Sequence, residues 1–484
     1  MADYPTLDPE NWADLRQNAH EALDLALDHM AGRSGAPVWQ GPTRRVRAAF
    51  TDALPGEGTE IRAIADRIAS DILPHDVGNT HPAFFGWVHG SGTPAGLVPE
   101  MFGAAMNANL GGRDHAANLV EHQVIGWCRE MFGFPGDAGG LIVSGTSVAT
   151  LIALKAARDK AAGLHLRDTG LKRHDGEFVG YASIEAHSCI ARAFDILGLG
   201  RDALRAIPVD ANFRMDTKIL RAMIEADRAA SRHPFAVIGS AGTVNVGAID
   251  PLAELADIAQ ENDLWFHVDG AFGASVVLNA ALAPLVRGIE RADSLAFDFH
   301  KWMHVNYDAG FVLMRDAEDQ RRAFAERPDY LLGAERGLAA GNPWFCEYGP
   351  ELSRGFRALK VWFHLLHFGT HRIGAMIGRN CEQARLLRDR VVAHPQLALL
   401  APVGLNITCF RFDPGRTSDA DLDALNAEIV IQLQERGLAA PSTTRIDGRL
   451  AIRVNLTNHR TRDRDLEDLV ENVLSIGGEL TAGG

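Results

Sequence analysis

Cysteine is scarce in this chain and follows no recognisable pattern. The cysteines are odd in number and scattered, without the spacing of a metal-ligand set: Cys128, Cys189, Cys346, Cys381 and Cys409. A disulfide framework needs paired cysteines in a secreted protein, and a structural zinc site needs closely spaced ligands. The pattern argues against both, so we predict no metal site and expect reduced thiols in a cytoplasmic protein.

Long apolar and long basic segments are also missing. No uncharged apolar stretch reaches the length of a membrane span, and the N-terminal sequence MADYPTLDPENWADL lacks the cationic start and apolar core of a signal peptide. The formal net charge is -14, from 48 basic and 62 acidic residues, without a long basic run. These absences argue against membrane and nucleic acid as partners, and a small-molecule substrate fits better.

What the sequence does contain is a lysine at the end of an apolar strand pattern. In the run DSLAFDFHKWMHVNYDAGFVLMRD, residues 293–316, an alternating strand leads directly into His300, Lys301 and Trp302. A lysine at a strand end usually extends to the surface. A buried ammonium group instead loses hydration, so its pKa falls and the amine can form a Schiff base with a carbonyl cofactor. Other motifs in the sequence distinguish a surface lysine from a Schiff-base lysine.

A carboxylate follows a second short strand. Residues 264–268, LWFHV, are typical of a buried strand, which ends in Asp269 and a small-residue turn. By itself such an aspartate is usually a turn former or a helix cap. In an open α/β sheet, however, groups at the carboxyl ends of strands line the ligand crevice. Pyridoxal 5'-phosphate (PLP) needs a lysine for its aldehyde and a carboxylate to keep its pyridine nitrogen protonated. Lys301 and Asp269 supply both.

Two further strand ends carry polar side chains. Residues 139–150 predict a strand, a hydroxyl-rich turn and a helix start, where backbone amides with Thr146 and Ser147 would cradle a phosphate. Such turns more often only cap a helix. His187 follows another strand and could lie flat on a heterocycle, although a lone histidine is more often structural. Their occurrence together with a lysine and an aspartate supports a cofactor site.

At these residues the chain resembles a known family. The ordered motifs are Gly145-Thr146-Ser147, Ala186-His187-Ser188, His267-Val268-Asp269-Gly270-Ala271 and His300-Lys301-Trp302. The set is similar to that of the group II PLP-dependent amino acid decarboxylases, which include aromatic-L-amino-acid, glutamate and cysteine-sulfinate decarboxylases. The similarity extends from about His81 to Arg453. It implies a PLP-dependent carboxy-lyase that converts an L-amino acid to its amine and carbon dioxide.

The resemblance also implies the architecture. We expect the α/β fold type I of PLP enzymes, with a mainly parallel seven-stranded sheet, a small α+β C-terminal domain and a helical N-terminal segment. The expected parts are residues 1–85, 86–360 and 361–484, and the length suits roughly three domain-sized units. The N-terminal part predicts an amphipathic helix after a start at residues 8–10. In the family this segment packs across a partner subunit, which implies an obligate homodimer; otherwise the helix lies on its own domain.

Further roles around the cofactor come from the resemblance alone. His187 would stack on one face of the ring, and Ala271 would pack against the other. The remaining cofactor-binding candidates are Thr146, Ser147, Thr243, Asp298 and His300. Relatives often have asparagine at the position of Asp298. Because a second anion beside a phosphate is unfavourable, Asp298 could orient His300 instead.

The product depends on the stretch from Ala323 to Tyr348, which has no clean periodicity and has the length of many lids. Tyr330 within it matches the mobile-loop tyrosine of the family, which is implicated in protonating the substrate carbon after carbon dioxide leaves. Related aldehyde synthases tend to have phenylalanine there. The resemblance therefore favours an amine product over an aldehyde, unless Tyr330 only packs in an ordered connection.

Substrate choice rests on two segments that match the pocket of the family, residues 84–92 and 106–115. The first retains Trp87, while the second has Asn107 and Asn109 where aromatic decarboxylases usually have apolar side chains. Unpaired amides beside an aromatic ring are unfavourable. An aromatic amino acid is nevertheless the leading expectation, and an acidic or other polar amino acid is the alternative.

The full candidate substrate-binding set is Trp87, His89, Asn107, Asn109 and Arg453, and a polar substrate would also bring in Arg113 or His115. Two other functions are also possible on this scaffold. One is a different PLP reaction, by an aldehyde synthase or a carbon-carbon lyase. The other is a non-catalytic PLP-binding protein, which the intact set of Lys301, Asp269 and His187 disfavours.

Overall fold

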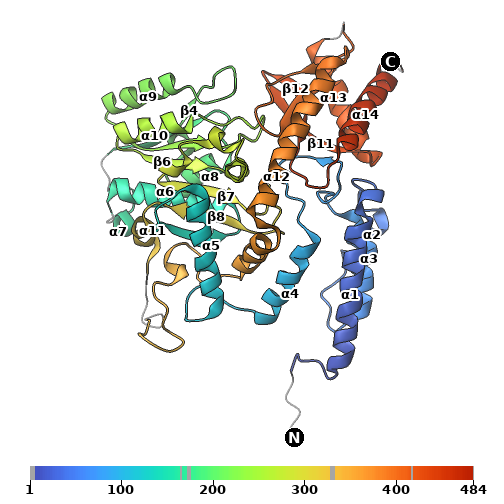
Figure 1. Ribbon diagram of the computed structural model, residues 1–484, viewed down its shortest axis with the longest axis horizontal. Helices are drawn as coiled ribbons and strands as arrows, with labels where there is room; N and C mark the ends of the chain where they lie inside the picture. Colours follow the sequence, from blue (N-terminus) through green and yellow to red (C-terminus); the bar gives the residue numbers. More distant parts are fainter. Residues whose placement is uncertain (1–5, 164–165, 172–175, 327–332, 416–417, 483–484) are drawn as a thin grey trace.

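The computed structural model describes the chain except for residues 1–5, 164–165, 172–175, 327–332, 416–417 and 483–484. Figure 1 shows a large sheet surrounded by helices, a smaller sheet near the C-terminus, and the N-terminal helices to one side. The long helix α12 (Arg357–Ala393) runs between the two sheets, and its regular geometry is interrupted at Gly369, where φ is 69°. The predicted α/β class is confirmed.

The large sheet is almost entirely parallel. Its strands lie in the order β2-β8-β7-β6-β5-β3-β4, and only β8 runs antiparallel to its neighbours. The strands are β2 (Gly139–Val143), β3 (Phe178–Ser183), β4 (Leu204–Ile207), β5 (His233–Ser240), β6 (Trp265–Asp269), β7 (Ser294–Asp298) and β8 (Gly310–Met314). Every residue of β2, β3, β6, β7 and β8 is buried. Burial of this kind explains the short continuous apolar runs in the sequence.

Helices alternate with these strands along the chain. They are α4 (Leu97–Met106), α5 (Ala116–Phe132), α6 (Thr146–Ala162), α7 (Leu166–Thr169), α8 (Cys189–Ile196), α9 (Thr217–Ala229), α10 (Leu252–Glu261) and α11 (Ala317–Phe324). The helices α9 and α11 begin at aspartates whose carboxylates accept backbone N–H bonds. Helix α6, which packs on several central strands, has no such side-chain cap. Its first turn is therefore open to another acceptor.

The smaller sheet has the order β1-β11-β12-β10-β9. Its strands are β1 (Phe84–Phe85), β9 (Leu397–Leu399), β10 (Ile407–Phe412), β11 (Ala440–Ile446) and β12 (Arg449–Asn455), covered by α13 (Asp419–Glu435) and α14 (Asp463–Ala482). Strand β1 pairs in parallel with β11. This pairing holds the start of the 86–92 loop on the C-terminal sheet. The predicted boundary between residues 360 and 361 falls inside α12, so it stays a prediction.

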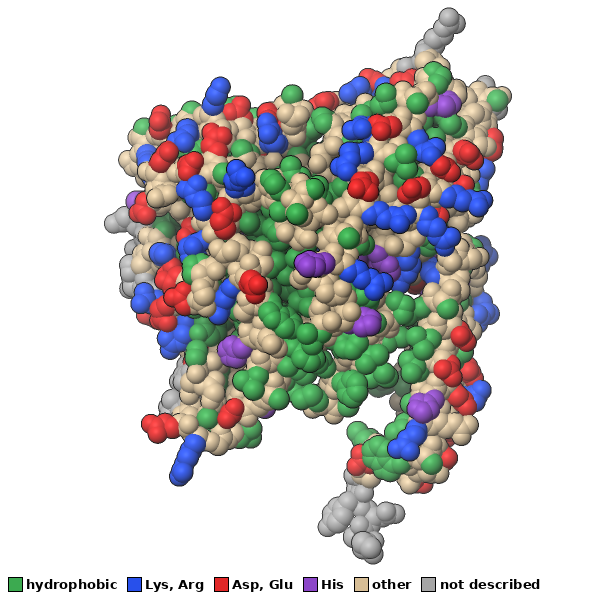
Figure 2. Space-filling view, viewed as in Figure 1, with side chains coloured by type: hydrophobic (Ala, Val, Ile, Leu, Met, Phe, Trp, Pro, Cys, Tyr) green, Lys and Arg blue, Asp and Glu red, His purple; other side chains and the backbone are tan. Residues whose placement is uncertain are grey.

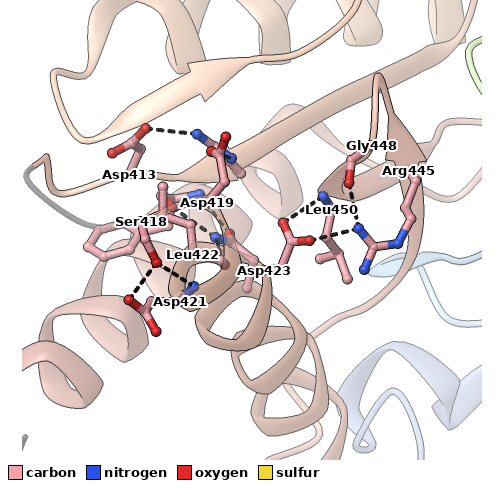
Figure 3. Close-up of polar contacts among 12 residues, drawn as sticks. Asp413, Ser418, Asp419, Asp421, Leu422, Asp423, Arg445, Gly448 and Leu450 are labelled. Carbon is pink, nitrogen blue, oxygen red and sulfur yellow. Dashed lines mark hydrogen bonds and ion pairs between the residues drawn. The ribbon is translucent and has the colours of Figure 1, made fainter.

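Figure 3 shows how α13 is fixed to this sheet. The Ser418 hydroxyl accepts the backbone N–H of Asp421 at 3.3 Å and thereby caps the helix. Asp423 accepts the backbone N–H of Leu450 at 2.8 Å and an N–H of Arg445 at 2.7 Å. The bonds of Asp423 tie the start of the helix to the hairpin of β11 and β12.

The N-terminal helices are α1 (Trp12–Gly32), α2 (Arg44–Ala48) and α3 (Ile61–Asp71). The predicted start at residues 8–10 is wrong, because the Asn11 side chain accepts the Ala13 N–H at 2.9 Å and makes Asn11 the N-cap. No residue of α1 is buried. Among the described residues, no helix is long and apolar enough to cross a bilayer.

Candidate active site

Lys301 lies in the turn that follows β7. Its ammonium nitrogen is 2.9 Å from Oδ2 of Asp298, the last residue of that strand. Burial alone would lower the pKa of Lys301, but the negative charges of Asp298 and Asp269 outweigh burial and raise it. The expectation of a depressed Lys301 pKa is therefore wrong, because the two carboxylates have a larger effect than burial. The lysine is held as an ammonium ion by a carboxylate.

Asp269 ends the neighbouring strand β6 and is 5% exposed. Its carboxylate accepts the Ala271 N–H at 3.1 Å. Burial raises the pKa of Asp269, and the positive charges of Lys301 and His187 oppose this rise. In the sheet register Asp269 pairs with Ala296, so the ends of β6 and β7 lie side by side. The structure thus brings the predicted lysine and aspartate to one sheet edge.

His187 lies between β3 and α8 with an exposed side chain. Its Nδ1 accepts the backbone N–H of Cys189 at 3.2 Å, which fixes the ring. Burial of part of the ring lowers the pKa of His187, and the charges of Asp269 and Lys301 also act on it. The structure therefore gathers His187 with the other two residues. A fixed imidazole with an open side can cover a flat heterocycle.

The first turn of α6 forms the fourth part of the site. The Thr146 N–H donates to Asp298 Oδ1 at 2.7 Å. The buried Thr146 hydroxyl has no hydrogen-bond partner among the described residues, while Ser147 is exposed. An unpaired hydroxyl at a helix N-terminus suits a phosphate. Gly310 allows this turn to lie against β8, since a Cβ at Gly310 would come within 2.3 Å of the Gly145 Cα.

The other cofactor-binding candidates have contacts within the chain. Asp298 lies closer to Lys301 and the Thr146 amide than to Nε2 of His300, which is 3.8 Å away. His300 accepts the backbone N–H of Ala309 at 3.1 Å. The carbonyl of Ala271 accepts the Asp298 N–H, and the Thr243 hydroxyl accepts the Ala248 N–H at 3.1 Å. The Thr243 hydroxyl therefore closes a turn, and its role toward a cofactor stays a prediction.

The 86–92 loop lies directly on the turn that contains Lys301, residues 299–303, which we call the lysine turn. A Cβ at Gly90 would be 1.8 Å from the carbonyl oxygen of His300, so only glycine permits this approach. The loop carries Trp87, which is 54% exposed, and His89, whose ring stacks on that of Trp87 at 5.7 Å. Sequence reasoning missed Tyr307, whose ring lies 4.3 Å from that of His300. The sequence feature that could have identified Tyr307 is an aromatic residue six positions after Lys301, in the connection between β7 and β8.

Two polar substrate candidates already have structural contacts. The Asn109 side-chain oxygen accepts the N–H groups of Gly111 and Arg354, each at 2.9 Å. The buried Arg453 guanidinium donates to the carbonyls of Val244, Asn245 and Trp87, and burial lowers its pKa to about 10. These contacts give both side chains a structural role that needs no substrate. Their substrate roles therefore stay predictions that the geometry does not strengthen.

The remaining candidates lie on the 106–115 segment. Asn107 is exposed in a left-handed conformation at the end of α4. The Arg113 guanidinium stacks over the Trp344 ring at 4.5 Å, and Nε2 of His115 is 3.3 Å from the Asn109 carbonyl. Tyr330 lies outside the described residues.

The parts at these strand ends are a buried carboxylate, an amine, a flat imidazole and an open anion cradle. They match a ring that carries a basic nitrogen, an aldehyde and a phosphate, and they define a PLP enzyme of fold type I. The family model for the pyridoxal-dependent decarboxylase conserved domain matches residues 43–413. The chain belongs to this family of PLP-dependent decarboxylases.

Individual relatives differ in their reactions. The chain is 31% identical to the aromatic-L-amino-acid decarboxylase of Bacillus atrophaeus, over 97% of this chain and 96% of that protein. It is 30% identical to the L-2,4-diaminobutyrate decarboxylase of Rhizobium meliloti, over 98% of this chain and 92% of that protein. The crystal structure of Rhodiola rosea 4-hydroxyphenylacetaldehyde synthase shares the fold, with a TM-score of 0.86 at 24% identity over 98% of this chain and 99% of that one.

Replacing Asp298 with asparagine tests the ion pair. Asparagine can still accept the Thr146 N–H but carries no charge, so burial then dominates and the pKa of Lys301 falls. More amine is neutral at pH 7, by roughly tenfold for each pKa unit. Reaction of apoprotein with pyridoxal, trapped by borohydride and followed by intact mass across pH, should therefore reach its midpoint at lower pH in Asp298→Asn.

Asp316→Asn is the matched control, because Asp316 also accepts a backbone N–H at a helix start but is not part of the site. Its midpoint should equal that of the unmodified chain. An unchanged midpoint in Asp298→Asn would contradict the role assigned to the ion pair.

Proposed function

We propose that this enzyme decarboxylates an L-amino acid to the corresponding amine and carbon dioxide, and that its substrate is aromatic. The observation that carries the reaction type is the placement of Asp269 and Lys301 at adjacent strand ends, within electrostatic reach of each other. The family relationship supports the same reaction type. An acidic or other polar amino acid is the alternative substrate, and an aldehyde synthase or carbon-carbon lyase is the alternative activity.

Each chain residue has a defined task in this proposal. PLP, when bound, supplies a conjugated ring that withdraws electrons from the bond being broken. Lys301 would hold the cofactor aldehyde through its nitrogen. Asp269 would keep a proton on the ring nitrogen, and the charges of Lys301 and His187 favour its ionised form against the effect of burial. The imidazole of His187 would cover one ring face and Ala271 the other, while the Thr146 hydroxyl and the start of α6 would bind the phosphate.

The aromatic assignment rests on the segments around the site. Trp87, His89 and Tyr307 place aromatic rings beside the lysine turn. The Bacillus atrophaeus relative is named for aromatic amino acids, and the Rhizobium meliloti relative for diaminobutyrate, so relatives alone do not decide. An amine product follows from the predicted role of Tyr330.

We also infer that the enzyme is a homodimer. Helix α1 has no buried residue although its sequence is amphipathic. Helix α4 exposes Met101, Phe102 and Met106, at 48%, 63% and 51%. Figure 2 shows hydrophobic side chains gathered over this region. An apolar surface of this kind typically forms an interface, and a second copy would cover it.

The reaction type is tested by measuring carbon dioxide and amine together with Asp269→Asn. The unmodified enzyme should release both in equal amounts, without ammonia or peroxide. In Asp269→Asn the ring nitrogen loses its charge partner, so turnover should fall at least roughly 100-fold while the cofactor stays bound. Near-normal turnover in this variant would refute the assigned role, and ammonia with peroxide from the unmodified enzyme would identify an aldehyde synthase.

The dimer is tested by sedimentation of Phe102→Asp. A carboxylate in the apolar patch would be buried without a partner, so the variant should sediment as a single chain of 52.4 kDa, while the unmodified enzyme sediments at twice this mass. Val392, 66% exposed on α12, provides the control, and Val392→Asp should remain dimeric. If the unmodified enzyme is an active monomer at assay concentration, the inferred homodimer is wrong.

A further inference from the structure

Two aromatic side chains from separate segments lie beside Lys301. The close approach of Gly90 to His300 seats the 86–92 loop on the lysine turn, and His89 is the residue just before this contact. Tyr307 comes from the connection that follows the turn. The two rings are 6.4 Å apart at an angle of 73°. Burial lowers the pKa of His89 and raises that of Tyr307, and the Lys301 charge acts on both groups.

Both rings are held in place by other parts of the chain. His89 stacks on Phe84 at 5.8 Å with 25° between the planes, and on Trp87 at 5.7 Å with 30°. Tyr307 packs against His300, the residue whose carbonyl oxygen lies against Gly90. Tyr307 is nevertheless 49% exposed. The side chains therefore form a fixed aromatic wall with an open side.

The charged side chains considered for the site are engaged in contacts within the chain. Asp298 faces Lys301, and the Arg453 guanidinium donates to three backbone carbonyls. Arg113 stacks over Trp344. A charged substrate side chain would have to displace one of these contacts, whereas a neutral ring would not. The wall therefore suits a neutral aromatic side chain.

We propose that His89 and Tyr307 are specificity-determining residues that contact the substrate side chain, and that they favour an aromatic ring carrying a hydroxyl group. This inference rests on the proposed function and specifies its substrate. The substrate amine must reach Lys301, so its side chain extends into the space next to the lysine turn, where this wall lies. The ring would pack on the wall, and its hydroxyl would bond to the polar groups of the wall.

The hydrogen-bonding capacity of the two groups fits a hydroxyl better than other rings. A neutral imidazole offers one acceptor nitrogen and one N–H, and within the described part of the chain neither ring nitrogen of His89 has a hydrogen bond. The phenol of Tyr307, a residue that is 49% exposed, can both donate and accept a hydrogen bond. A phenolic substrate both donates and accepts, an indole only donates, and an unsubstituted phenyl ring does neither. Sites built to bond a hydroxyl discriminate against the analogue that lacks it.

The test compares L-tyrosine, L-tryptophan and L-phenylalanine by kcat/KM in the holoenzyme, with carbon dioxide as the readout. The unmodified enzyme should prefer them in that order. Tyr307→Phe and His89→Phe keep the rings but remove the polar atoms. Each should lower kcat/KM for L-tyrosine by roughly 3- to 10-fold, the effect of one partly exposed hydrogen bond, and change L-phenylalanine by less than about 2-fold. The loss should lie mainly in KM.

His367→Phe is the matched control, because His367 stacks on Phe363 at 5.7 Å and 23° on the exposed side of α12. It should change neither substrate. Competitive inhibition of the unmodified enzyme provides a second measurement that needs no variant. Tyramine should bind more tightly than phenethylamine.

Three results would overturn the inference. Equal losses on L-tyrosine and L-phenylalanine would show that the two rings only maintain the structure. Equal inhibition by tyramine and phenethylamine would show that the wall does not recognise the hydroxyl. Carbon dioxide from a non-aromatic amino acid alone would overturn the inference and leave the decarboxylase assignment intact. The absence of carbon dioxide from all amino acids tested would instead count against the proposed function itself.

Discussion

The ion pair between the partly buried Lys301 and the buried Asp298 is the interaction around which the site is organised. Burying charged groups is unfavourable unless each has a partner, and the fold supplies partners at every point. Asp298 receives the Lys301 ammonium and the Thr146 amide, and Asp269 receives the Ala271 amide. Because these contacts come from the ends of β6 and β7 and the start of α6, the parallel sheet itself positions the charges. The ammonium then lies where a cofactor aldehyde would need an amine.

A second ion pair, which is fully buried, connects the sheet with the 106–115 segment. Arg354 and Glu121 are both almost fully buried and contact each other, and Arg354 also donates to the Leu110 carbonyl. Glu121 accepts the Ile142 N–H of β2 at 3.0 Å. The 106–115 segment is thus fixed to the same sheet that carries the cofactor residues. Asn109 contributes to this arrangement through its bond to the Arg354 backbone, which explains a polar residue there without a substrate.

Sequence patterns predicted the strand ends of this site well, because parallel strands place their carboxyl ends at one edge. Lys301, Asp269, His187 and Thr146 were predicted and come together in the structure. The charge state of Lys301 was not predictable, since it depends on a contact with Asp298 that only the turn geometry creates. Tyr307 was missed for a similar reason. Its position depends on the close approach of Gly90 to the lysine turn, which joins segments far apart in the sequence.

The central claim is that Lys301 is the amine that holds the cofactor. Borohydride reduction of the holoenzyme followed by peptide mass mapping tests it most directly, because reduction converts a carbon-nitrogen double bond into a stable link. We predict a phosphopyridoxyl group on the peptide that contains Lys301 and on no other. A modification at Lys155, Lys160 or Lys360 instead, or the absence of any modified lysine in a protein that retains PLP, would contradict the assignment.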